Sequence, residues 1–166
     1  MEKNKTFTPV EQSFLNDVPR NNKVNVPYIV VDNFPNLGML TALRFLEWVH
    51  ENPAGVISLP TGKTPEYFIF WTQHILENWD NESILELRKK HGLMFQDKPS
   101  LAELYFVQID EFYPIQSSQA NSFYHYVNKY YIEGFGLKRE NALLINSNEI
   151  PLAEGKGFEE IFRIIK

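Results

Sequence analysis

The ten residues 56–65, with the sequence VISLPTGKTP, constrain the fold of this chain more than any other stretch. The first four are apolar or small and predict a short buried strand, which Pro60 and Gly62 then end. Thr64 followed by Pro65 is typical of a helix start, because a hydroxyl can cap the first turn and proline presets the backbone for the first helical position. The stretch therefore predicts a strand that runs through a tight loop into a helix.

Such a loop suits an anion. Backbone N–H groups at a helix N-terminus point outward, and the helix dipole adds partial positive charge, so a phosphate is the natural ligand. Lys63 either adds charge to that site or only faces solvent, and a plain strand-to-helix turn is the alternative to the site as a whole. A Walker A motif would need glycine where Ile57 stands, which argues against nucleoside triphosphate hydrolysis.

The rest of the chain alternates apolar runs with helical periodicity, which is typical of an α/β domain. Strand, helix and strand in succession predict right-handed parallel βαβ units, the first of them around residues 36–50. The expected strands are 28–31, 54–59, 104–109 and 142–145, and the expected helices are 36–50, 65–79, 80–91, 121–131 and 158–165.

Composition excludes several classes of function. The chain has 166 residues and a net charge of −5, which argues against a nucleic-acid partner held by bulk charge. It has no cysteine, which excludes disulfides and thiolate chemistry and fits a reducing compartment. No apolar run approaches the ~20 residues that span a membrane, and the polar start lacks a signal core. We therefore expect a cytoplasmic protein with no nucleic-acid or membrane partner.

Residues 1–26 predict a polar N-terminal extension before the domain at 27–166. They are rich in asparagine and interrupted by two prolines, so they are expected to lie on the surface or to be partly mobile. A docked arm or an oligomer contact is as compatible with the sequence as disorder. The apolar residues that could dock a short helix are Phe7, Val10, Phe14, Leu15 and Val18.

Asp110 and Glu111 follow the expected strand 104–109, at the sheet edge where α/β proteins place their chemistry. Adjacent side chains point to opposite sides, so one carboxylate should face a site while the other caps or orients. A solvated acidic turn is the alternative. Ser122 could cap a helix or touch a ligand. The histidines lack metal-ligand spacing, so no metal site is predicted.

Two stretches together resemble the glucosamine-6-phosphate deaminases. Residues 59–65 are similar to the Leu-Pro-Thr-Gly-x-Thr-Pro loop of that family. Residues 110–112, followed by 121–123, are similar to its Asp-Glu-Tyr segment and the serine-containing helix start after it. The pair, within a match from about Val26 to Ile150, indicates the wider group of these deaminases and the 6-phosphogluconolactonases. Lactonases tend to carry arginine after Asp-Glu, so the aromatic Phe112 favours the deaminase branch.

The resemblance implies a three-layer, doubly wound (Rossmann-like) and mainly parallel sheet. It implies an enzyme of amino-sugar metabolism that converts an amino-sugar 6-phosphate to a ketose phosphate and ammonia, with no cofactor. Asp110, in a catalytic pair with Glu111, would move a proton between C2 and C1 of the ring-opened sugar. The residues implied to hold the phosphate are Thr61, Gly62, Lys63 and Thr64, and Ser122 is implied to contact the small-molecule sugar phosphate.

The sequence departs from the family in two places. Lys63 stands where the family usually has glycine or serine, and Glu66 would repel a phosphate unless it turns away or pairs with Lys63. The family's later Gly-x-Gly-x-Asp-Gly-His segment, which opens the sugar ring, does not occur. We therefore expect an incomplete sheet, truncated at its C-terminal end, whose uncovered apolar faces favour a homo-oligomer. A non-catalytic sugar-phosphate or assembly module, and lactone hydrolysis, stay open as alternatives.

Overall fold

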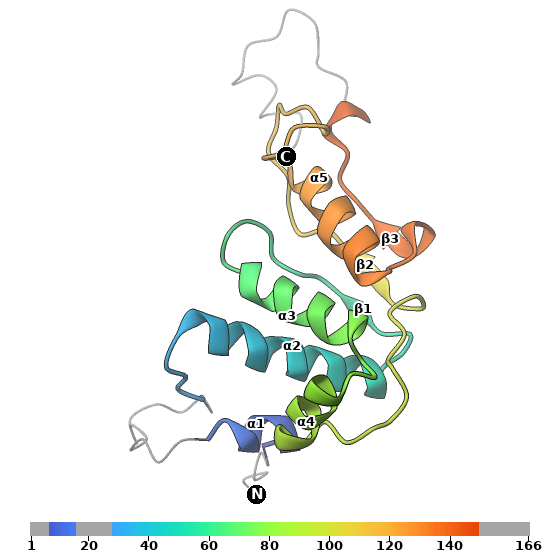
Figure 1. Cartoon of the computed structure of the whole chain (residues 1–166). Helices are drawn as coiled ribbons and strands as arrows, with labels where there is room; N and C mark the ends of the chain where they lie inside the picture. Colours follow the sequence, from blue (N-terminus) through green and yellow to red (C-terminus); the bar gives the residue numbers. More distant parts are fainter. Residues whose placement is uncertain (1–6, 16–27, 150–166) are drawn as a thin grey trace, which may run out of the picture.

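The computed structural model describes residues 7–15 and 28–149, and its three strands form a parallel sheet beside the helices (Figure 1). The strands β1 (Val56–Ile57), β2 (Tyr105–Val107) and β3 (Ala142–Leu143) lie side by side in that order. Both neighbouring pairs run parallel, as the apolar runs predict. The predicted α/β fold with a parallel sheet is therefore confirmed.

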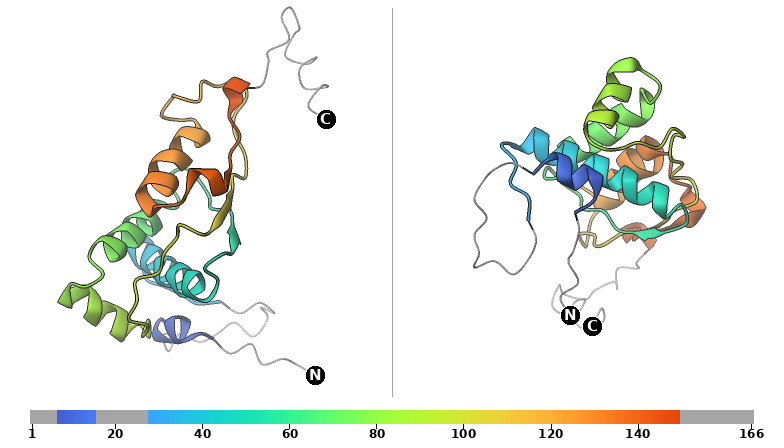
Figure 2. Two further views of the ribbon diagram at one scale, coloured as in Figure 1. Left: turned by 90° about the vertical axis from the view of Figure 1, so that its right-hand side faces the viewer. Right: turned by 90° about the horizontal axis from the view of Figure 1, so that it is seen from below.

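Helices cover one side of this sheet. α2 (Phe34–Glu51) packs along α3 (Glu66–Glu77), and α5 (Phe123–Val127) continues directly into a π-helix at Asn128–Glu133. Figure 2 shows these helices on the same side of the three strands. Both crossovers run in the same direction along the sheet, so right-handed connections place their helices on one face. The other face carries no helix from the described ranges 7–15 and 28–149.

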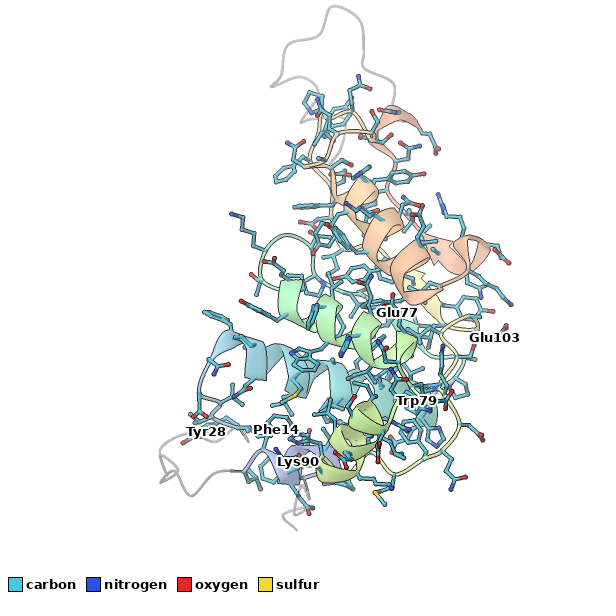
Figure 3. The ribbon with its side chains drawn as sticks, in the orientation of Figure 1. Phe14, Tyr28, Glu77, Trp79, Lys90 and Glu103 are labelled. Atoms are coloured by element: carbon cyan, nitrogen blue, oxygen red, sulfur yellow. The ribbon has the colours of Figure 1, made fainter. Side chains whose placement is uncertain are left out.

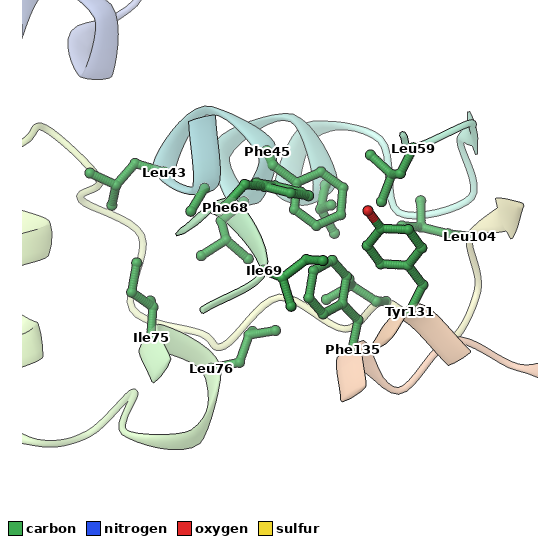
Figure 4. Packing of buried hydrophobic residues seen from close by; sticks show 14 of the residues in the cluster. Leu43, Phe45, Leu59, Phe68, Ile69, Ile75, Leu76, Leu104, Tyr131 and Phe135 are labelled. Carbon is green, nitrogen blue, oxygen red and sulfur yellow. The ribbon is translucent and has the colours of Figure 1, made fainter. Parts of the chain in front are cut away.

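The main hydrophobic core lies between these helices and the inner face of the sheet (Figure 4). Phe106, in the middle of β2, is 1% exposed, and the ring of Tyr131 packs 5.8 Å from it. Phe45, Phe68 and Phe135 form a triangle of rings whose centroids lie 5.5 to 5.8 Å apart. Each such pair adds about 0.5–1.5 kcal/mol beyond its buried area, so this triangle fixes α2, α3 and the end of the π-helix against one another.

The helix predictions hold better than the strand predictions. The expected helices at 36–50, 65–79 and 80–91 are confirmed as α2, α3 and α4 (Glu82–Lys90), and the expected helix at 121–131 is divided between α5 and the π-helix. The expected helix at 158–165 lies outside the described residues. The remaining elements of the described ranges are α1 (Pro9–Ser13) and 3-10 turns at Arg139–Asn141 and Ser147–Glu149.

The strand expected at 28–31 is wrong. These residues are irregular, and the described sheet consists of β1, β2 and β3 alone. A β-rich apolar run becomes a strand only where it joins the ladder of a neighbouring strand, and the described sheet does not include these residues. The first predicted βαβ unit is therefore absent, although α2 forms as expected. The described helices also include none that is long and apolar enough to cross a membrane.

The described part of the N-terminal extension docks as a short helix, as its apolar residues indicate. Val10 of α1 is fully buried in the core, and a capping box between Thr8 and Glu11 holds the helix start. The Thr8 hydroxyl donates to Glu47 of α2 at 2.9 Å, and Arg44 Nε donates to Glu11 at 3.0 Å. Val18 lies outside the described residues, so its docking stays untested.

His91 makes the docking of α1 sensitive to acid. Its ring stacks on Phe14 at 4.5 Å, its Nδ1 is hydrogen-bonded to Ser13 at 2.8 Å, and its buried Nε2 has no partner in the described residues. Figure 3 shows Phe14 and Lys90 at the same end of the molecule. Burial, and then the charge of Lys90, lower the pKa of His91 below 6.5. The folded chain therefore resists a proton that the unfolded chain accepts.

Stability is accordingly expected to fall as the pH drops below about 6.5, the ordinary histidine value, toward the lower folded pKa. Thermal melts between pH 7.5 and 5 should show this loss in the wild type and much less of it in His91→Gln. His74→Gln, on α3, serves as the control and should retain the wild-type profile. Identical profiles for the wild type and His91→Gln would contradict the assignment.

Candidate functional site

The loop after β1 and the acidic pair after β2 lie side by side at the carboxyl edge of the sheet. β1 and β2 pair in parallel, with Ile57 opposite Phe106. Both segments therefore leave the sheet at its carboxyl edge, beyond the last paired residues. Ligands of open α/β sheets bind outside the carboxyl ends of the strands, so the two predicted halves of the site share the expected edge.

Two tyrosine hydroxyls hold the loop from the helical side. Tyr126 donates to the Gly62 carbonyl at 2.8 Å, and Tyr131 donates to the Pro60 carbonyl. Gly62 has a φ of 87°, a left-handed conformation that favours glycine. Burial, with smaller contributions from Tyr130 and Glu66, raises the pKa of Tyr126 to about 12, so its hydroxyl remains a donor at neutral pH.

The start of α3 differs from the sequence prediction. Thr64 was expected to cap the helix with Pro65 at its first position, but Pro65 itself is the N-cap and no side chain bonds to the first turn. The glycine turn displaces the helix start by one residue, which removes the Thr64 hydroxyl from capping. Thr64 is exposed and makes no hydrogen bond within the described residues.

The other polar groups of the loop are also unengaged. Thr61 is half-buried, Lys63 is exposed, and neither side chain forms a hydrogen bond or ion pair with any described residue. Glu66 is exposed too, and the pairing between Lys63 and Glu66 that the sequence left open is not formed. The loop therefore presents two hydroxyls and one ammonium group to solvent.

Glu111 is the residue of the acidic pair that caps the start of α5. Its carboxylate accepts hydrogen bonds from the Ser122 hydroxyl at 2.7 Å and from the backbone N–H groups of Tyr124, Phe123 and Phe112 at 2.7, 3.0 and 2.9 Å. Burial alone would raise the pKa of Glu111, but these four donors outweigh burial and lower it. Glu111 thus stays ionised and ties the strand end to the start of α5.

Ser122 is engaged in the same network. It is fully buried, it is the N-cap of α5, and its oxygen accepts from the His125 N–H at 3.3 Å while its hydroxyl donates to Glu111. Its hydroxyl therefore serves the helix start in this structure. The predicted contact of Ser122 with a substrate remains a prediction.

Asp110 is the free carboxylate. It is exposed, and its carboxylate forms no hydrogen bond or ion pair with a described residue. Its backbone is fixed instead, because the buried Gln108 donates from Nε2 to the Asp110 carbonyl at 2.8 Å. Oε1 of the same Gln108 accepts from the Ile145 N–H at 3.0 Å, which joins the ends of β2 and β3.

Sequence reasoning missed three residues that shape this edge: Gln108, Tyr126 and Tyr131. An amide within the otherwise apolar run 104–109 was a signal that could have marked Gln108. The two tyrosines carried no such signal, because their periodicity is that of core residues. Their role depends on a contact between segments more than sixty positions apart in the chain.

The predicted site residues that line cavities belong to two separate cavities. One of about 770 Å³ lies between α3 and α5 and is lined by Gly62, Lys63 and Ser122. Another of about 450 Å³ lies between α2 and the loop, and of the predicted residues it includes Thr64. Neither is lined by Thr61 or by the acidic pair. Within residues 7–15 and 28–149, no three histidine, aspartate or glutamate side chains lie close enough to hold a metal ion.

Comparisons with known proteins give matches among solved structures. No family model matches the sequence, and no curated protein matches it either. Among solved structures, the chain is similar to a monomeric glucosamine-6-phosphate deaminase described as a missing link of the NagB superfamily, with a TM-score of 0.57 and 20% sequence identity. The match covers 74% of this chain and 43% of that deaminase, so it spans less than half of that protein's length. Over this part, the chain has the Rossmann-like fold of a NagB-superfamily deaminase.

Proposed function

We propose that this chain binds an amino-sugar 6-phosphate and acts as a glucosamine-6-phosphate isomerase/deaminase, with Asp110 as the general base. The observation that carries the proposal is the loop at residues 60–64. Two tyrosines fix its backbone, while the hydroxyls of Thr61 and Thr64 and the ammonium group of Lys63 stay unengaged. Asp110, also unengaged, follows the neighbouring parallel strand β2.

The segment after β1 would bind the phosphate, and the segment after β2 would carry out the proton transfer. The loop would hold the phosphate through backbone N–H groups and hydroxyls, with Lys63 adding positive charge. The Asp110 carboxylate would take the proton from C2 of the ring-opened sugar and return it at C1 through an enolamine. Water then hydrolyses the resulting ketose imine, which releases ammonia and the ketose phosphate. Glu111 would act as a positioning residue, because its carboxylate is occupied by four donors.

A second candidate is sugar-phosphate binding without turnover. The sequence has no Gly-x-Gly-x-Asp-Gly-His segment, which in the family supplies the residues that open the sugar ring. Binding through the loop does not require that segment, whereas rapid turnover of a closed sugar does. Lactone hydrolysis is less well supported, because Phe112 stands where lactonases tend to carry arginine.

The test is ammonia release from glucosamine 6-phosphate, with binding measured in parallel by calorimetry. Asp110→Asn is expected to lower the rate about 10²–10⁴-fold with little change in binding, because it removes proton transfer and leaves the loop intact. Thr64→Ala is expected to weaken binding, and Asp97→Asn, an exposed aspartate outside the site, should change neither. Binding without ammonia release would select the second candidate. Absence of both would overturn both candidates.

A further inference from the structure

We propose that Gln108 is a positioning residue for Asp110, and that it links this aspartate to the segment that follows β3. The inference deepens the proposed function and rests on it, because the position of Asp110 matters only if Asp110 acts as the base. Gln108 directly follows β2 and is 5% exposed. Because it is buried, it would act through Asp110 rather than by touching the substrate.

A buried amide at the end of an apolar strand costs free energy of desolvation unless its polar atoms are hydrogen-bonded. The amide of Gln108 meets this condition with two backbone partners on different segments. Nε2 donates to the Asp110 carbonyl at 2.8 Å, and Oε1 accepts from the Ile145 N–H at 3.0 Å. An apolar side chain would fill the same space without that cost, so the value of the amide lies in these two contacts.

The side chain of Gln108 also decides where the ladder between β2 and β3 ends. The Gln108 N–H donates to the Leu143 carbonyl at 2.9 Å, which continues the parallel pattern. The next bond of that pattern would join the Ile145 N–H to the backbone carbonyl of Gln108, but the side-chain Oε1 accepts it instead. The backbone is thereby released from the ladder, and residues 109–111 leave the sheet at its carboxyl edge.

Asp110 is therefore held through its backbone on both sides while its carboxylate stays free. Its carbonyl accepts from Gln108, and the next residue, Glu111, is fixed by four donors. The segment after β3 holds the far end of the same loop as well, because the Ser147 hydroxyl donates to the Ile115 carbonyl at 2.6 Å. Supports of this kind hold a catalytic group within about 0.5 Å of its productive position.

The first test compares kcat and KM for ammonia release from glucosamine 6-phosphate by the full chain. Gln108→Met keeps the length of the side chain and removes both hydrogen bonds, so kcat is expected to fall about 10–10²-fold with little change in KM. Asn141→Ala is the matched control, because Asn141 Nδ2 donates to the Ala102 carbonyl at 3.2 Å and joins the segments that precede β2 and β3. The control should lower the melting temperature slightly and leave kcat unchanged.

Gln108→Glu distinguishes positioning from packing. A protonated carboxyl offers one donor and one acceptor, as the amide does, whereas the ionised form offers no donor. Burial raises the pKa of a carboxyl, and so do the mainly acidic charged residues of the segments after the three strands, which are Lys63, Asp110, Glu111 and Glu149. The ratio of the variant's kcat to that of the wild type should therefore rise as the pH falls from about 8 to about 6. Taking the ratio at each pH removes the titration of Asp110, which both proteins share, and thermal melts at each pH verify that both stay folded.

The possible results separate the positioning role from the proposed function. Wild-type turnover that Gln108→Met leaves unchanged would overturn the positioning role alone. So would a kcat ratio for Gln108→Glu that stays constant with pH, or a loss of kcat in Asn141→Ala as large as that in Gln108→Met. A wild type that releases no ammonia would overturn the proposed enzymatic function, and the positioning role with it.

Discussion

Gly38→Ala is expected to lower the free energy of unfolding by about 2 kcal/mol, the middle of the range for an overpacked core. The sign is unusual, because alanine in a helix interior is normally the more stable residue by about 1 kcal/mol. Here α2 and α3 cross at Gly38, and a Cβ would lie 2.4 Å from the Tyr67 Cβ and 2.6 Å from its carbonyl carbon. Neither atom is the free end of a side chain, so the helices would have to separate.

Urea unfolding measures this effect directly. Thr41→Ala, one turn further along the exposed side of α2, is the matched control and should stay within about 0.5 kcal/mol of the wild type. If Gly38→Ala were as stable as this control, the close approach of α2 and α3 would be refuted.

Glu111→Gln is expected to have the second large effect, lowering the free energy of unfolding by about 2 kcal/mol at neutral pH. The carboxylate accepts four hydrogen bonds, and a hydrogen bond to a charged acceptor contributes about 1.5–3 kcal/mol net, so the loss of one of them accounts for the expected effect. The amide presents only one acceptor oxygen, and its NH₂ group faces donors. The start of α5 should loosen, together with the buried Ser122 hydroxyl.

The pH dependence has a definite sign. The pKa of Glu111 is lower in the folded chain than its ordinary value of 4.5, so its contribution is complete above about pH 4.5. It is lost as the pH falls through the lower folded value, because the unfolded carboxylate binds a proton first. Urea unfolding at pH 7 and pH 3 should show a smaller difference for Glu111→Gln than for the wild type. Glu77→Gln, a control at an exposed position on α3, should show the same difference as the wild type. If Glu111→Gln lost as much free energy of unfolding between pH 7 and pH 3 as the wild type does, the role assigned to Glu111 would be refuted.

Local patterns predicted the helices more fully than the strands, because β1, β2 and β3 fall within three of the four expected strands but each is shorter than expected. A helix satisfies its backbone within its own segment, so the periodicity of residues 36–50 was enough to find α2. A strand depends on a neighbour that the local sequence does not identify. The run at 28–31 has the composition of a strand but is irregular and does not belong to the described sheet, so its prediction was wrong.

For the candidate site too, local sequence predicted some features, whereas others depend on tertiary contacts. The expected adjacency of the loop and Asp110 came from two strand ends, and the parallel pairing of β1 and β2 places those two ends at one edge of the sheet. Which carboxylate of the pair stays free depends on where α5 begins, because the N–H groups of that helix capture Glu111. The anchoring of the loop by Tyr126 and Tyr131 depends on tertiary contacts that no local pattern encodes.

Tyr126 lies in α5, and Tyr131 lies in the π-helix at Asn128–Glu133 that follows it. Residues five apart in a continuous α-helix point about 140° away from each other at 3.6 residues per turn, which would direct Tyr126 and Tyr131 to different sides. A π-helix closes its hydrogen bonds between residues five apart, so the π-helical residues between the two tyrosines reduce this angle. With the wider turn, both hydroxyls bind the same loop, one at the Pro60 carbonyl and the other at the Gly62 carbonyl. Removing one residue from that turn would shift one hydroxyl off the loop while leaving every loop residue unchanged.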